Sequence, residues 1–221
     1  NIKIEIYDLS SQLIRDRINL LLKNGVGGLI LVLIILFLFL RFRVAIWVAV
    51  GIPAAISATL AVMLVTGQSI NMISLFALIM MLGIIVDDSI VVAEHIDYQY
   101  EKNNNAYEAS YIGASKMLGP VTAASLTTIA GFAPVFLITG VIGQVIEAIP
   151  LVVISVILAS LFECFFVLPG HLNHSLSGNY NYIEKRFFNL NNYLTYFNNN
   201  YFYFLLKKSI KFRYTTLSLA L

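Results

Sequence analysis

The sequence INMISLFALIMMLGIIVDDSIVVAEHI (residues 70–96) decides the fold, because it is a long apolar segment with two adjacent acids inside it. Between residues 70 and 93 the only charged side chains are Asp87 and Asp88. A helix over these residues would be about 35 Å long, which is enough to cross a hydrocarbon core of about 30 Å. The pattern therefore predicts a membrane-spanning helix that carries both carboxyl groups within the membrane.

Two carboxyl groups at this depth have a large energetic cost. One Asp near the bilayer centre costs about 2.5–3.5 kcal/mol on insertion scales, so two would cost roughly 5–7 kcal/mol if the costs add. Such groups are tolerated where they face protein or a wet cavity, and they usually mark a path for ions or protons. Burial and a neighbouring carboxylate both disfavour the charged form. We expect Asp87 and Asp88 to bind and release a proton; the alternative is a pair that only hydrogen-bonds to neighbouring helices.

Composition places the whole chain in a membrane. Its 221 residues are 59% hydrophobic and only 12% charged, whereas a soluble domain carries about 25% charged residues. The apolar segments are too numerous and too long for a signal peptide. Arg41 closes the first of them, and no other Lys or Arg lies inside any, so the paired acids have no basic partner at membrane depth. We expect five membrane-spanning helices, at about residues 25–41, 44–65, 70–93, 119–139 and 145–168.

The segments outside the predicted spans are more polar. Residues 1–24 begin with an alternating strand pattern at residues 2–7 and continue as an amphipathic helix that leads from a soluble domain into the bilayer. Residues 97–116 are predicted to form a cytoplasmic loop, and residues 169–211 a cytoplasmic region with a Tyr-rich interfacial helix. Residues 212–221 resemble the start of a further span. Because the chain begins without Met and ends in apolar sequence, we expect a fragment of a larger protein.

Lys and Arg are distributed unevenly about the predicted spans. The two short turns on one side, residues 66–69 and 140–143, carry none. The positive-inside rule places the other side, with most of the basic residues, in the cytoplasm. Of the 14 Lys and Arg, ten lie on that side: Arg41, Arg43, Lys102, Lys116, Lys185, Arg186, Lys207, Lys208, Lys211 and Arg213.

Three other polar residues give weaker signals of a supporting role. Glu163 lies in the fifth span, where it could face either the bundle interior or the cytoplasmic interface. Glu94 lies seven residues after Asp87, on roughly the same helix face. It could be either a solvated residue at the end of the helix or part of a proton exit. Ser74 lies fourteen residues before Asp88, on a face that could be wet.

Several classes of function find no support in the sequence. His171 and His174 are three residues apart but have no third ligand nearby, so we predict no metal site. The single cysteine, Cys164, excludes an internal disulfide and a cysteine-based metal cluster. The sequence has no phosphate-binding loop, no catalytic Ser/His/Asp or Cys/His set and no nucleic-acid-binding patch. We expect a protein that is not an enzyme, has no cofactor and has membrane lipid as its surroundings.

Four motifs together resemble one family of transporters. The segment GIIVDDSIVVAEHI (residues 83–96) resembles the fourth-span motif of resistance–nodulation–division (RND) efflux permeases. This resemblance implies an all-α, polytopic bundle that forms one half of a 12-helix transporter, with spans two to six present and residues 2–7 ending a periplasmic porter domain. Three further segments of the chain resemble neighbouring segments of the same family: LKNGVGGLILVLIILFLFLRFRVAIWVAVGIPAAI (residues 22–56), SINMISLF (residues 69–76) and LASLFECFFVLPGHL (residues 158–172).

The resemblance also implies an activity and partners. RND permeases exchange protons for substrate, and by motif position Asp87 and Asp88 look like their proton-relay aspartates, with the proton as coupling ion. The basic residues that complete the relay lie in the other half of family members. The paired Asp resembles the branch that exports hydrophobic and amphiphilic compounds, and Glu163 matches a family glutamate to which we assign no role. The family works in the bacterial inner membrane as a homotrimer, with a periplasmic adaptor protein and an outer-membrane channel.

Four alternatives stay open on sequence grounds. The heavy-metal branch of the family typically has a single Asp at this point. A proton-driven accessory of protein secretion has a related architecture, and the length of sequence before residue 1 would distinguish it. In a lipid- or sterol-sensing receptor of similar fold the acids would bind instead of transport, which proton flux in liposomes would reveal. The Asn- and Tyr-rich tail also leaves a degraded, non-functional gene piece open.

Overall fold

A computed structural model describes residues 10–177 and 197–220 of the chain. The chain divides into two units, residues 1–182 and residues 183–221. All regular structure within the described ranges is helical. The strand predicted at residues 2–7 lies outside the described residues.

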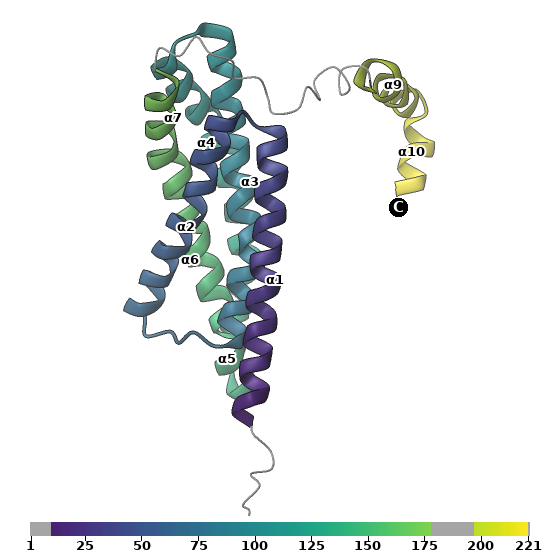
Figure 1. The fold of residues 1–221 in the computed structure, drawn as a ribbon. Helices are drawn as coiled ribbons and strands as arrows, with labels where there is room; N and C mark the ends of the chain where they lie inside the picture. The colour runs from purple at the N-terminus through teal and green to yellow at the C-terminus, as the bar shows by residue number, and fades with distance from the viewer. Residues whose placement is uncertain (1–9, 178–196, 221) are drawn as a thin grey trace, which may run out of the picture. The chain divides into compact units, whose positions relative to one another are not determined.

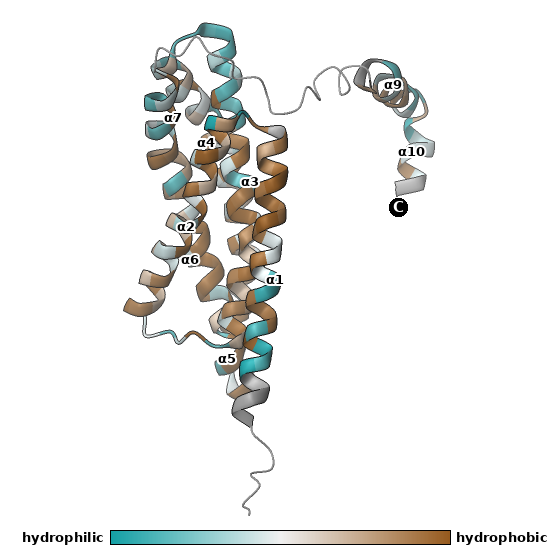
Figure 2. Cartoon of the chain, in the orientation of Figure 1, coloured by the Kyte–Doolittle hydropathy of each residue, from teal (hydrophilic) through white to brown (hydrophobic). Residues whose placement is uncertain are grey.

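The first unit is a bundle of long helices (Figure 1). Helix α3 is its central element, because it packs against α1, α2, α4, α6 and α7. Figure 2 shows apolar residues along the middle of the bundle and polar residues at the connection between α3 and α4. The elements are α1 (Ser10–Phe39), α2 (Phe42–Val65), α3 (Met72–Asn103), α4 (Ala106–Phe132), the 3₁₀ turn η1 (Ala133–Leu137), α5 (Gly140–Ile146), α6 (Ala148–Phe162), the π-helical turn η2 (Glu163–Val167) and α7 (Leu168–Leu176).

Five helical segments of this unit are long and apolar enough to cross a membrane. The predicted all-α polytopic bundle is therefore confirmed, and the chain is a multi-pass membrane protein. The last of the five segments comprises α5, α6, η2 and α7. The five are Arg15–Leu38, Phe42–Val65, Met72–Asn103, Ala106–Leu137 and Gly140–Leu176.

The long helix α3 begins at a well-formed cap. The Asn71 side chain accepts hydrogen bonds from the backbone N–H groups of Ile73 and Ser74, at 2.9 Å each. In return the Ser74 hydroxyl oxygen accepts from the Asn71 backbone N–H at 2.8 Å. This reciprocal arrangement is a capping box, and it satisfies backbone donors that a helix start leaves free. The polar turn before α3 thus fixes where the span begins.

Our expectation of a loop at residues 97–116 is wrong in its secondary structure. Helix α3 continues to Asn103, and α4 begins at Ala106. Only Asn104 and Asn105 connect them: Asn104 has a φ of +50°, and the Asn105 side chain accepts from the Glu108 N–H. Asn tolerates the left-handed conformation and caps helices well, so two residues suffice for the reversal. The polarity of this segment did not reveal that its charged residues lie on extended helices.

A cluster of ion pairs and hydrogen bonds holds the ends of α2, α3 and α7 together. Arg41, between α1 and α2, lies with Nε 3.2 Å from Oδ2 of Asp97 on α3, and it also pairs with Glu101 one turn further along α3. Arg43 of α2 donates to the backbone oxygen of Ser175 in α7 at 2.9 Å. Tyr100 of α3 donates to the backbone oxygen of Leu176 at 3.1 Å. These bonds lie at the end of the bundle where the sequence places the basic residues.

We expect Arg41→Gln to destabilise the bundle, because it removes the charge beside a largely buried carboxylate. The Asp97 side chain is only 7% exposed, and breaking a buried pair costs about 3–5 kcal/mol, less where one partner is partly exposed, as Arg41 is. We therefore expect a loss of about 2–3 kcal/mol, measured as a lower Tm by circular dichroism in detergent. Lys102→Gln, which removes an exposed basic residue at the same end, is the control. Equal Tm values for the two variants would contradict this role.

The second unit contains short helices with an exposed, mixed basic and aromatic surface. It comprises the π-helical turn η3 (Asn198–Phe202), α9 (Tyr203–Lys211) and α10 (Arg213–Ala220). Residues 178–196, which include much of the predicted interfacial helix, lie outside the described residues. Residues 169–176, which we assigned to that interfacial region, instead belong to α7 and continue the last span.

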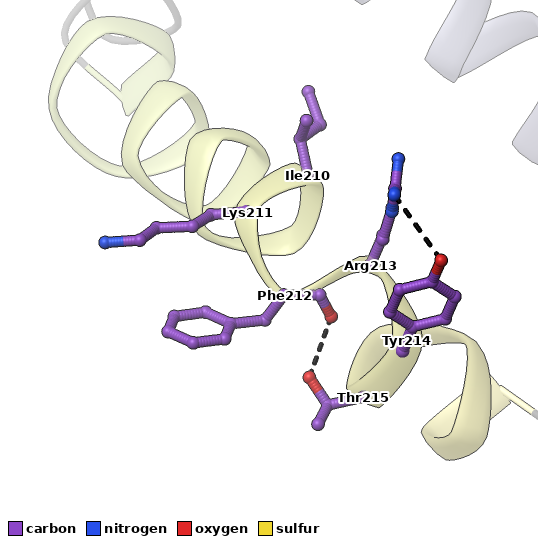
Figure 3. Close-up of a pocket in the computed structure, with 6 residues that line it drawn as sticks. All are labelled: Ile210, Lys211, Phe212, Arg213, Tyr214 and Thr215. Atoms are coloured by element: carbon purple, nitrogen blue, oxygen red, sulfur yellow. Dashed lines mark hydrogen bonds between the residues drawn. The ribbon is translucent and has the colours of Figure 1, made fainter.

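A shallow pocket of about 530 Å³ lies where α9 meets α10 (Figure 3). The chain bends at Phe212, whose backbone oxygen accepts from the Thr215 hydroxyl at 2.7 Å. The Arg213 guanidinium lies over the Tyr214 ring, 5.0 Å from its centroid. These contacts are between close neighbours in sequence and account for the local geometry of the bend, so the pocket needs no ligand to explain it.

Candidate functional site

Helix α3 places the paired acids at the middle of its length. Asp87 lies fifteen residues after Met72 and sixteen before Asn103, the ends of the helix. At about 1.5 Å per residue each acid is roughly 22 Å from either end. Because α3 is also the central helix of the bundle, both carboxyl groups lie on the element with the most neighbours.

The two acids have different surroundings. Asp87 is exposed on the surface of the bundle, whereas Asp88 is half-buried and faces Ser125 of α4. Oδ2 of Asp88 and Oγ of Ser125 are both buried, and neither forms a hydrogen bond of normal geometry with the described residues. The Ser125 hydroxyl can donate to a charged Asp88 or accept from a neutral one. A proton on Asp88 would remove the cost of burying its charge and let the acid donate to Ser125.

Neither Asp87 nor Asp88 forms an ion pair with any described residue. The charge neutralisation that a pair of intramembrane carboxylates requires must therefore come from protons or from groups beyond the described ranges. The exposed position of Asp87 leaves it accessible to such groups.

A third acid, Glu163, lies inside the bundle at the start of the π-helical turn η2. It is 5% exposed, so the bundle interior is the correct one of the two positions we considered for it. Its Oε2 lies 3.4 Å from Oγ of Ser89 and 3.7 Å from Sγ of Cys164. Ser89 directly follows Asp88 on α3. Ser89 is therefore next to two acids from different spans: Asp88 in the sequence and Glu163 in space.

The remaining sequence candidates lie away from these acids. Glu94 is exposed on α3. Ser74 is buried, but its hydroxyl belongs to the capping box at the start of α3 and also lies 3.1 Å from the Ser69 backbone oxygen. Its observed contacts are therefore those of a helix cap. His171 stacks on Trp47 of α2, with ring centroids 4.1 Å apart and an interplanar angle of 6°.

Sequence reasoning missed two residues of the site, Ser89 and Ser125. Both are small hydroxyl side chains inside apolar helices, a pattern that is common and has no specific meaning alone. The only available signal was that Ser89 follows the paired acids directly. Ser125 could not be assigned without knowing how α4 packs on α3, since it lies 37 residues after Asp88 in the sequence.

The fold and this site define a class: a multi-pass membrane protein with a pair of acids in the middle of its central span. The whole chain, residues 1–221, matches the model of the AcrB/AcrD/AcrF family, and the chain belongs to that family. The assignment to the RND permeases from the motifs is therefore confirmed.

Individual relatives match parts of the chain. It is 33% identical over 130 residues to "Multidrug resistance protein MdtC" of Proteus mirabilis, which covers 59% of this chain and 13% of the relative. It is 32% identical over 127 residues to the Escherichia coli protein of the same name, covering 58% and 12%. A match of 33% over 92 residues to "Uncharacterized transporter" of Haemophilus influenzae covers 42% and 9%. The chain thus spans only a small part of the relatives that it matches.

Proposed function

We propose that this chain supplies the energy-coupling helices of a proton-driven RND efflux permease in the bacterial inner membrane. The observation that carries the proposal is the position of Asp87 and Asp88, in the middle of the central span and without an ion-pair partner among the described residues. Membership of the AcrB/AcrD/AcrF family and the printed names of relatives support export of drug-like compounds. The family assignment also argues against the secretion accessory and the sensing receptor.

The mechanism couples the charge of the paired acids to helix packing. When Asp88 takes up a proton, the free-energy cost of burying its carboxyl group falls. The charged form prefers contacts with water or basic groups, whereas the neutral form can donate to acceptors such as Ser125. Because α3 packs on five other helices, a shift of this helix alters the whole bundle. Helix α1 is continuous from Ser10 to Phe39 and can transmit that motion to residues before the membrane.

By the same family likeness, the complete protein would act as a homotrimer with a periplasmic adaptor protein and an outer-membrane channel. The substrates would be hydrophobic or amphiphilic compounds.

Transport by the full-length protein in proteoliposomes tests the proposal. We expect an imposed pH gradient to drive movement of an amphiphilic dye, and a protonophore to abolish it. Addition of dye should also release protons across the membrane, which an enclosed pH indicator would report. Dye transport that survives the protonophore unchanged would contradict proton coupling, and transport of divalent metal ions instead of dye would favour the heavy-metal branch.

A further inference from the structure

The carboxyl group of Glu163 occupies a site enclosed by three helical elements. It projects from η2 toward Ser89 of α3 and packs against Gly51 of α2. A Cβ atom at position 51 would lie 2.6 Å from Cδ of Glu163, so the glycine leaves the space that the carboxyl group fills. Glu163 is 5% exposed and Gly51 is buried. The site is thus closed to lipid and to bulk water in this arrangement.

The hydrogen-bond donors around Glu163 are too few for a carboxylate. The Ser89 hydroxyl has a single hydrogen, and its nearest acceptor is the backbone oxygen of Ile85 at 3.0 Å, compared with 3.4 Å to Glu163. The Cys164 thiol, 3.7 Å away, is a weak donor. If Ser89 donates to Ile85, its oxygen is free to accept a hydrogen bond from Glu163. This geometry fits a neutral acid, which donates through its own O–H group.

The backbone at this point is also unusual. Glu163 is the first residue of a π-helical turn that interrupts an otherwise α-helical span between α6 and α7. Such turns are rare, and within α-helices they frequently occur at functional sites. Three features therefore occur at the same place in the bundle: the π-helical turn, Gly51 opposite it, and the buried carboxyl group of Glu163.

We propose that Glu163 is a second proton-binding site of this bundle. In the described arrangement it carries the proton and donates to Ser89. When α2 and α3 separate from η2, water enters, the O–H bond breaks, and the proton passes to water and leaves a carboxylate. Return of a proton from water restores the neutral acid and the closed packing. This inference rests on the proposed proton-driven transport for its role, but the protonation itself can be tested separately.

The titratable groups around Glu163 do not provide a compensating positive charge. Cys164 adjoins it on the same turn, and Asp88 of α3, which precedes Ser89, is close enough to act electrostatically on Cys164. On α2 the basic residue Arg43 lies eight residues before Gly51, and on α4 the basic residue Lys116 lies nine residues before Ser125. In α7 the ring of His171 stacks on Trp47. Among the residues that the structure describes, no basic group is shown in contact with a carboxylate at this position.

Infrared spectroscopy of the full-length protein in lipid bilayers tests the protonation. We expect the C=O stretch of a neutral carboxylic acid at pH 7 in an Asp88→Asn background, chosen because it removes the other half-buried acid. This band should vanish in Glu163→Gln, persist in Glu163→Asp, and shift in Ser89→Ala, which removes its hydrogen-bond acceptor. Glu147→Gln, at an exposed acid on another turn, should leave the band unchanged.

Two outcomes would overturn the inference. A band of equal intensity with and without Glu163→Gln would show that the neutral acid lies elsewhere, and absence of any band would show that Glu163 is ionised. Either result, with proton-driven dye transport intact in the wild-type protein, would refute this site alone. Loss of proton coupling in the wild type, with the Glu163 band present, would instead refute the proposed function and leave the second site standing. Because Gln matches Glu in size, Glu163→Gln is expected to fold, and its Tm provides the check.

Discussion

Full-length protein carrying Asp88→Asn should lose proton-driven dye transport down to the level of empty vesicles. Asn has nearly the same size as Asp but cannot take up and release a proton, so α3 would keep one charge state through the cycle. Asp87→Asn should have the same effect if the pair binds its proton jointly, as adjacent carboxyl groups do. The measurement is dye accumulation in proteoliposomes under an imposed pH gradient.

The same variant should be at least as stable as the wild type. An ionised Asp in a membrane span costs about 2.5–3.5 kcal/mol on insertion scales, and the neutral amide avoids much of this cost. Loss of transport together with an unchanged or higher Tm would identify a residue retained for function at the expense of stability. Glu147→Gln, which removes an exposed acid, should leave transport unchanged. Normal transport in both aspartate variants would refute the mechanism.

The membrane-spanning bundle could be predicted from the sequence because it depends on local information. Apolar runs long enough to cross a bilayer, interrupted by short polar turns, specify spans without knowledge of how they pack. Asp87 and Asp88 could be found for the same reason, since charge inside an apolar run is visible in one dimension. Polarity alone, however, did not separate a loop from a helix beyond the membrane, so the extensions of α3 and α4 were missed.

The surroundings of the acids could not be predicted, because they depend on contacts between distant parts of the chain. Ser125 faces Asp88 only because α4 packs antiparallel to α3 after a two-residue reversal. Glu163 meets Ser89, 74 residues earlier in the sequence, through a π-helical turn that no sequence pattern indicated. Gly51 leaves space for the Glu163 carboxyl group because it has no side chain, and this role becomes apparent only when the two residues are seen packed together.

The packing of α4 on α3 gives a second large expected effect on stability. A Cβ atom at Gly113 of α4 would lie 2.7 Å from Cα and 2.9 Å from the backbone nitrogen of Ile96 on α3. Because these are backbone atoms of a central helix, they cannot rotate away, and the two helices must move apart. We expect Gly113→Ala to cost about 1–3 kcal/mol by overpacking, and Gly113→Leu to cost more.

Gly119→Ala is the matched control on the same helix. Apart from its chain neighbours and the backbone of its own helix, no atom lies within 4 Å of a Cβ built at Gly119, so this variant should not overpack the bundle. Because Gly119 precedes Pro120, we expect no gain from helix propensity and only a small change in stability. Thermal unfolding of the full-length protein in detergent measures both variants, as a change in Tm relative to the wild type. Since Ser125 lies on the same helix as Gly113, separation of α3 and α4 should also move it away from Asp88 and weaken dye transport. If Gly113→Ala and Gly119→Ala shifted Tm equally, close packing of these helices would not be what holds Asp88 against Ser125.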